Sequence, residues 1–206
     1  SQGALKIAAY NNYDETSEAT ISSDGTILIL GIETDFTHGG SDLYFSKKKE
    51  DGTFGFLQNM GKMINSAADE GMPQLLSDNK TIVFSTNGFS GYGEYDIYVS
   101  HRLDETWKNW SEPQNLGKKI NSNDFDGLPF YDERDEKLYF IQAIDGIQYL
   151  KHVTIPKKEI MNNSIYDFYK ISKYTNVFLN NLKYKIDVYK SKKSFTIYDM
   201  GDFFDF

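Results

Sequence analysis

The sequence contains no cysteine, only four prolines and no long apolar run. Without cysteine the chain can form neither disulfides nor thiolate metal ligands, and a cysteine nucleophile is excluded. A helix needs about 20 mostly apolar residues to cross a bilayer, so we expect no transmembrane segment. The first ten residues, SQGALKIAAY, also lack the basic and apolar regions of a signal peptide.

The chain also has fewer basic than acidic residues, with 22 lysines and arginines against 30 aspartates and glutamates. The net charge of −8 and a sequence pI of about 4.9 disfavour a nucleic-acid partner, because phosphate backbones are bound mainly by Lys and Arg. Aromatic residues, by contrast, make up 16% of the chain. This abundance of Tyr and Phe is typical of a folded, β-rich protein.

The chain contains an internal repeat with a period of about 55 residues. The segment SSDGTILILGIETDFTHGGSDLYFSKK, which starts at Ser22, aligns with LSDNKTIVFSTNGFSGYGEYDIYVSHR, which starts at Leu76. The motif NMGKMINS then returns as NLGKKINS. A third copy, YDERDEKLYFIQAIDGIQYLKH, is clear around Asp135 and fades after Phe140.

Each copy has the pattern of short strands separated by turns. TILILGI and TIVFSTN are apolar enough to be buried on both faces, whereas DLYFSKK and DIYVSHR alternate like half-exposed strands. Asp24-Gly25 and Asp78-Asn79 are hairpin-turn pairs. Pro73, Pro113 and Pro129 are expected at strand edges or starts. A unit of this size with about four strands is typical of a propeller blade. We therefore predict an all-β propeller, or a propeller-like array of four-stranded blades.

The second copy resembles the TolB-type β-propeller repeat, on the evidence of LSDNKTIVFSTN followed by GEYDIYVSHR. The continuation TWKNWSEPQNLGKKINS is similar to repeats of Gram-negative envelope proteins that are often joined to OmpA-like peptidoglycan-binding domains. The resemblance covers about residues 17–150, and IDGIQYL departs from it in the third copy. It implies an exported protein, periplasmic or associated with the outer membrane, whose signal is absent from this chain.

The predicted organisation has two parts. Residues 1–155 hold about three blades, which is fewer than the usual 4–8, so the array is partial or the chain is a fragment of a longer protein. Residues 156–206 change abruptly to a composition rich in Lys, Asn and Tyr. Their pattern predicts an irregular β-rich extension or a final blade.

Loops of successive blades are expected to emerge on one face. Segments 35–41, 65–71, 88–94 and 121–127 would bring aromatic and acidic groups together there, as in a binding surface built on a rigid scaffold. The alternative is that these residues form ordinary solvated turns. The candidate binding residues are His38, Asp69, Glu70, Phe89, Tyr92, Asp124, Phe125 and Asp126.

No catalytic residue, cofactor or metal ligand is predicted. GFSGYG lacks the final glycine and the helix of a nucleophile elbow, and His38, His101 and His152 have no spacing typical of a metal site. His101 is expected to be an exposed strand end. NSNDFDG has oxygen ligands suited to calcium but lacks the rest of the twelve-residue loop. Trp107 and Trp110 are predicted to pack between neighbouring sheets, although a Trp pair could also stack on a sugar.

The predicted function is that of a non-catalytic scaffold that binds an envelope protein or a peptidoglycan-associated partner. One alternative is a carbohydrate-active enzyme with two carboxylates in the propeller mouth. Another is the regulatory propeller of a serine peptidase, whose hydrolase domain would lie beyond Phe206. The sequence leaves the oligomeric state open.

Overall fold

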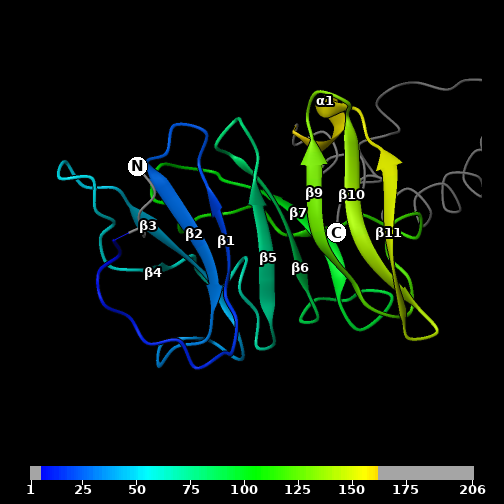
Figure 1. Ribbon diagram of the computed structural model, residues 1–206, viewed down its shortest axis with the longest axis horizontal. Helices are drawn as coiled ribbons and strands as arrows, with labels where there is room; N and C mark the ends of the chain where they lie inside the picture. The colour runs from blue at the N-terminus through cyan, green and yellow to red at the C-terminus, as the bar shows by residue number, and fades with distance from the viewer. Residues whose placement is uncertain (1–5, 162–206) are drawn as a thin grey trace, which may run out of the picture. The chain divides into compact units, whose positions relative to one another are not determined.

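The computed structural model describes residues 6–161 (Figure 1). These residues are all-β apart from one short helix, and none of their helices is long and apolar enough to cross a membrane. The elements are β1 (Glu18–Ile21), β2 (Ile27–Ile32), β3 (Asp42–Lys47), β4 (Gln58–Asn59), β5 (Glu70–Leu75), β6 (Thr81–Thr86), β7 (Asp96–His101), β8 (Gln114–Asn115), β9 (Asp126–Asp132), β10 (Lys137–Ile144), β11 (Ile147–Thr154) and α1 (Lys157–Ile160).

The strands form three separate antiparallel sheets, one for each copy of the repeat. The first sheet has the order β1-β2-β3-β4, the second β5-β6-β7-β8 and the third β9-β10-β11. The register is repeated as well, since Ile29 pairs with Phe45 in the first sheet as Val83 pairs with Val99 in the second. Within the described residues the sheets do not close into a barrel or propeller. The extension predicted for residues 156–206 lies almost wholly outside the described part.

The hairpin turns follow the sequence prediction. Gly25 has a φ of 70° and Asn79 a φ of 53°, values that Gly and Asn tolerate best. The Asp24 carboxylate accepts hydrogen bonds from the backbone N–H and the hydroxyl of Thr26 at 3.0 and 2.7 Å. These turns connect each first strand to a buried second strand.

Two prolines lie inside strands, where the sequence analysis had placed them at strand edges or starts. Pro73 sits within β5 and Pro129 within β9, and each follows a residue with positive φ, Met72 or Leu128. The register of both strands shifts at these points. A bulge tolerates a residue without an N–H, which explains how a strand can contain proline here.

Side chains from neighbouring sheets form two apolar cores. The first core lies between the first and second sheets, and the second core joins the second sheet to the third. Trp107 and Trp110 are buried in the first core, where the Trp107 ring stacks on Phe45 at 6.2 Å between centroids. The prediction that the tryptophans pack between sheets is confirmed.

The third strands are more buried than their alternating pattern suggested. β7 is buried along its whole length and β3 along all but its last residue, so the prediction of half-exposed strands is wrong. The Ser46 and Ser100 hydroxyls donate hydrogen bonds to the carbonyl groups of Gly55 and Ser111, in segments that run along the edges of β3 and β7. His101 is also buried rather than exposed. Its Nδ1 lies 3.1 Å from the Thr81 hydroxyl.

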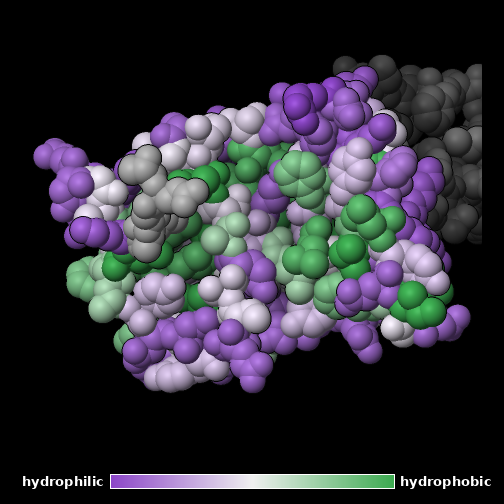
Figure 2. Space-filling view, in the orientation of Figure 1, coloured by the Kyte–Doolittle hydropathy of each residue, from purple (hydrophilic) through white to green (hydrophobic). Residues whose placement is uncertain are grey.

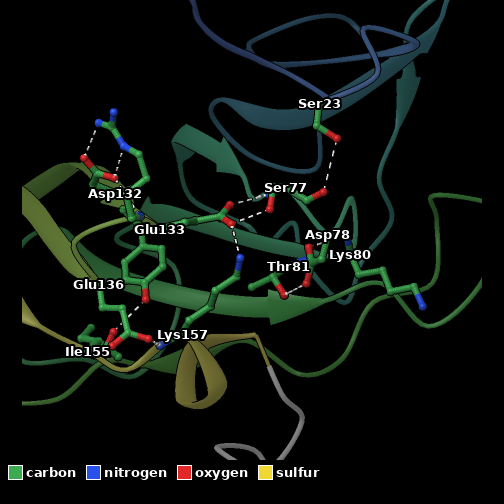
Figure 3. A network of polar contacts seen from close by, with 12 residues as sticks. Ser23, Ser77, Asp78, Lys80, Thr81, Asp132, Glu133, Glu136, Ile155 and Lys157 are labelled. Atoms are coloured by element: carbon green, nitrogen blue, oxygen red, sulfur yellow. Dashed lines mark hydrogen bonds and ion pairs between the residues drawn. The ribbon is translucent and has the colours of Figure 1, made fainter.

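At one end of the sheets, the turns of neighbouring copies are tied together (Figure 3). The Ser23 hydroxyl donates to the Ser77 carbonyl at 3.3 Å, and the Ser77 N–H donates to Glu133 at 2.7 Å. Glu133 also forms an ion pair with Lys157 of α1 at 2.9 Å. Ser23, Ser77 and Glu133 lie at corresponding turns, so the copies follow one another with a regular offset.

Candidate binding face

The predicted loops do meet at the other end of the sheets. The Gly40 N–H donates to the Ala68 carbonyl at 3.2 Å, which joins the β2–β3 loop to the connector before β5. In the next copy, a side chain at Gly93 would meet the carbonyl oxygen of Asp124 at 2.4 Å. Loops from successive copies therefore touch closely, and glycine is needed where they do. We call this end of the molecule the loop face.

A duplicated network of Asp and Asn side chains holds these loops to the strands. The Asn65 amide is bonded to both backbone groups of Leu43 and to Asn59, which in turn donates to Asp42 at 2.6 Å. In the second copy the same pattern joins Asn121 to the backbone of Ile97 and to Asn115, which donates to Asp96 at 2.8 Å.

The two aspartates complete the network by fixing the β2–β3 and β6–β7 loops. Asp42 accepts a hydrogen bond from the His38 N–H at 2.9 Å, and Asp96 accepts one from the Tyr92 N–H at 2.6 Å. Both aspartates are buried, and one oxygen of each has no partner within the described residues. The loop face is thus attached to the sheets at the same two points in each of the first two copies.

Two residues predicted for the binding face belong to this framework. Glu70 is fully buried and accepts hydrogen bonds from the Ser66 N–H at 2.7 Å and from the Thr86 hydroxyl at 2.8 Å. Asp126 is equally buried and accepts from the Ser122 hydroxyl at 2.9 Å and from Gln142 at 2.6 Å. Their carboxylates point into the protein, so they position the loops and do not face solvent.

Three further predicted residues are half-buried and link neighbouring elements. The Asp69 carboxylate accepts from the Ser41 N–H at 3.0 Å and from the Tyr95 hydroxyl at 2.9 Å. The Tyr95 ring packs on Phe125 at 5.6 Å, and Phe89 packs on Tyr98 at the same centroid distance. Asp69, Phe89 and Phe125 therefore tie the loops together and offer only part of their surface to a ligand.

His38, Tyr92 and Asp124 are the predicted residues that the structure places on the outside. Tyr92 is 40% exposed, and the Lys118 ammonium group lies 5.7 Å from its ring centroid. Around them the loop face also exposes three apolar or aromatic residues that the sequence analysis had not selected: Tyr13, Phe36 and Met63. The face therefore combines aromatic surface with a mixture of carboxylate and basic groups.

Burial changes the acidity of the framework carboxylates. Desolvation raises the pKa of Asp42, although hydrogen bonds from His38 and Asn59 work against it. Desolvation also raises the pKa of Glu70, and the negative charge of Asp42 adds to the effect. Desolvation and the hydrogen bond to Asp69 raise the pKa of Tyr95 far above its ordinary value. The loop face thus keeps its acidic framework in a poorly hydrated setting.

The donor groups of the loop face are mostly engaged in holding it together. Among residues 6–161, no group of three or more His, Asp or Glu side chains is arranged to hold a metal ion. In the NSNDFDG segment, Ser122 and Gln142 already occupy the oxygens of Asp126. What the arrangement can do is present exposed side chains on a fixed surface, as binding loops on a scaffold do.

The framework asparagines were missed in the sequence analysis, although a signal was present. NMGKMINS and NLGKKINS repeat both framework asparagines of each copy, together with a glycine whose φ is positive, Gly61 or Gly117. A motif repeated in this way at a turn indicates a role in holding that turn. The comparison with other proteins adds no identification: no family model matches the chain, and no curated protein is significantly similar to it.

Proposed function

We propose that this chain is a non-catalytic binding scaffold of the cell envelope of a Gram-negative bacterium. The three sheets would be blades of a partial TolB-type propeller array, and the loop face would be its binding surface. The repeat motifs support the blade assignment, as does the position of β5 beside both β1 and β9. In a propeller, the first strands of successive blades lie side by side in this way.

One observation carries the binding role: the duplicated Asp–Asn network fixes the loops of the first two copies in the same way. A surface that is ordered before binding loses little conformational entropy when a partner docks, which favours affinity. On this surface Tyr92, Phe36 and Tyr13 offer aromatic area, and aromatic residues often dominate the energetics of protein interfaces. The partner is an envelope protein or a peptidoglycan-associated component.

The proposal can be tested by site-specific photo-cross-linking in the full chain, expressed in the envelope of a Gram-negative host. A photoreactive phenylalanine analogue replaces Tyr92 on the loop face or, as the control, Phe56, an aromatic residue that is 73% exposed away from that face. We expect a discrete cross-linked partner from position 92 and none from position 56. Equal cross-linking at both positions, or none at either, would contradict a binding role for the loop face.

A second measurement separates the two kinds of partner. Co-sedimentation with purified peptidoglycan sacculi should be weakened several-fold by Tyr92→Ala with Asp124→Asn if the component is peptidoglycan itself. If the partner is a protein, sedimentation with sacculi stays at background while the cross-link at position 92 remains. Cross-linking from position 92 that is unchanged by Phe36→Ala would remove Phe36 from the binding surface.

A further inference from the structure

The third sheet has an apolar side that no other described sheet covers. Cross-strand partners share a face of a sheet, so Phe130, Tyr139 and His152 lie together, as do Ile141 and Leu150. We call these five residues the open face. Phe130 is 56% exposed and Leu150 71% exposed. Figure 2 shows apolar side chains gathered over β9 and β10.

In the other two sheets, the corresponding side holds the next sheet. By register, Leu150 corresponds to Ile97 in the second sheet and to Leu43 in the first. Leu43 lies in the core shared with the second sheet, and Ile97 lies in the core shared with the third. Both are completely buried. The open face is therefore equivalent to the faces by which the first and second sheets each pack against the next sheet.

The opposite end of the array is already covered. The outer side of the first sheet packs Leu28, Leu30 and Tyr44 against Ile7 near the N-terminus. The backbone of this segment is hydrogen-bonded to Phe54 on both sides, from the Phe54 N–H to the Lys6 carbonyl and from the Ala8 N–H to the Phe54 carbonyl. A second copy cannot stack head-to-tail on the open face unless this segment is displaced.

We propose that the open face binds the open face of a second copy and so forms a twofold-symmetric dimer. An interface of this kind closes on itself and needs only one self-complementary patch. Charge selects the orientation: Lys137 begins β10, and Asp145 lies in the turn at its far end. With the β10 strands of the two copies running in opposite directions, each Lys137 lies near the Asp145 of the other copy. The alternative would place like charges together.

The size of the open face determines the affinity that we expect for the dimer. Three strands of about eight residues give a surface of roughly 26 by 14 Å, using about 3.3 Å per residue and about 4.8 Å between strands. This area is small for a permanent dimer, and such interfaces are usually weak. We expect dissociation in the micromolar range, so that dimers form at high protein concentration and separate on dilution.

Sedimentation velocity on the full chain over a wide concentration range tests this proposal. The unmodified protein should pass from one to two chains as the concentration rises, and Leu150→Lys should remain a single chain throughout. Leu103→Lys, at a 53% exposed position after β7 and outside the open face, should still dimerise. Fluorescence of the buried Trp107 and Trp110, which lie in the first core, checks that each variant is folded.

A single introduced thiol reports what covers the face. The chain has no cysteine, so Leu150→Cys carries the one reactive thiol. We expect this thiol to be protected from alkylation at high protein concentration and to react freely on dilution. The thiol of the control variant Leu103→Cys should react freely at every concentration. Free reaction at all concentrations would show an uncovered face and overturn the proposal. Protection at all concentrations in a single chain would also overturn it, because another segment of the chain would then be the occupant.

Discussion

Asn65 and Asn121 are the residues on which the loop face most depends. Each side chain bonds both the N–H and the carbonyl group of a buried strand residue, Leu43 or Ile97, and reaches a second asparagine as well. A buried backbone group that loses its partner costs about 1–3 kcal/mol. These two side chains therefore stabilise the fold, although the sequence shows them only as part of the repeated motif NMGKMINS and NLGKKINS.

Replacing Asn121 by Ala should lower the free energy of unfolding by about 2–4 kcal/mol, because the N–H and carbonyl groups of Ile97 lose their buried partner. Asn109→Ala is the matched control, since the side chain of the exposed Asn109 donates only to Asp104 at the surface. We expect its effect to stay within about 0.5 kcal/mol. Urea denaturation followed by tryptophan fluorescence measures both changes. Equal losses in the free energy of unfolding would show that the Asn121 network does not stabilise the protein more than a surface hydrogen bond does.

The framework carboxylates predict an unusual dependence on pH. Burial raises the pKa of Asp42 and Glu70 in the folded state, so the fold favours their protonated forms. Their stabilising contribution is complete below the unfolded pKa of about 4 and is lost as pH rises through the raised folded values. Asp24 and Asp132 act in the opposite sense. A hydrogen bond from Ser22 and one from Arg134, respectively, lower each pKa to about 2.

We therefore expect the unmodified protein to gain free energy of unfolding, relative to Asp42→Asn, as pH falls through the raised folded pKa of Asp42. Both proteins should lose free energy of unfolding below about pH 4, where the groups with lowered pKa are protonated. Desolvation lowers the pKa of the buried His101, which opposes the gain equally in both proteins. Asp42→Asn should flatten the upper part of this profile, because it removes one buried charge and also the repulsion on Glu70. Denaturation midpoints measured at half-unit pH intervals give the two profiles. Parallel profiles of the two proteins from pH 7 down to about 4 would contradict the assignment.

Sequence patterns predicted some residue environments and missed others for identifiable reasons. The turns at Gly25 and Asn79 could be predicted because positive φ restricts the residue type. The burial of Glu70 and Asp126 could not, since an acidic residue in a loop normally faces water. The signal lies four residues earlier, where Ser66 or Ser122 supplies a backbone N–H and a hydroxyl to the carboxylate.

At the scale of elements, the loops of neighbouring copies approach so closely that side chains are excluded. A Cβ atom at Gly39 would lie 2.3 Å from the backbone of Ala67 in the connector to the next sheet. Because the obstacle is backbone rather than a flexible side chain, the loop itself must move. The contact between the first two copies thus depends on a residue type and not only on apolar burial.

Gly39→Ala should destabilise the protein by about 1–3 kcal/mol, since it overpacks a backbone contact. Gly55→Ala is a suitable control, because its Cβ would meet nothing closer than 3.6 Å and the residue has no positive φ. We expect the control to be neutral or slightly stabilising. Thermal unfolding of the two variants side by side measures the difference, and equal melting temperatures would disprove the close approach.

The strands show where periodicity succeeds and fails for whole elements. The continuous apolar runs of β2 and β6 predicted central, fully buried strands, as found. The alternating β3 and β7 were expected to be half-exposed because Ser, Tyr and His usually reach solvent. Their polar groups instead find partners inside, such as Gly55 for Ser46 and Ser111 for Ser100. A segment that bonds along the edge of a strand leaves no periodic signal in that strand.

At the scale of the whole molecule, the second sheet is the one that packs against another described sheet on both sides. One side of the first sheet packs against the second sheet, and its other side packs against the segment around Ile7. One side of the third sheet packs against the second sheet, and its other side is the open face. Local opening is rarest where apolar contacts surround an element. The described part of the chain should therefore be most stable in the middle.

We expect amide hydrogens in β6 and β7 to exchange most slowly, with those of β2 and β3 next and those of β11 fastest among the long strands. Hydrogen-exchange mass spectrometry on the full chain gives this order by peptide. If peptides from β10 and β11 outlast those of β6 at low protein concentration, stability is not centred on the second sheet. At high concentration, protection of β11 should increase if the third sheet pairs with a second copy.

The three sheets never share a backbone ladder; their contacts are made by side chains, turns and close-packed loops. The second junction uses corresponding parts of the repeat to the first, with an offset of one copy. An unequal crossover that duplicates one copy would therefore insert a complete layer whose two sides already fit its neighbours. The architecture can lengthen during evolution by whole modules, and every existing hydrogen-bonded pair of strands survives the change.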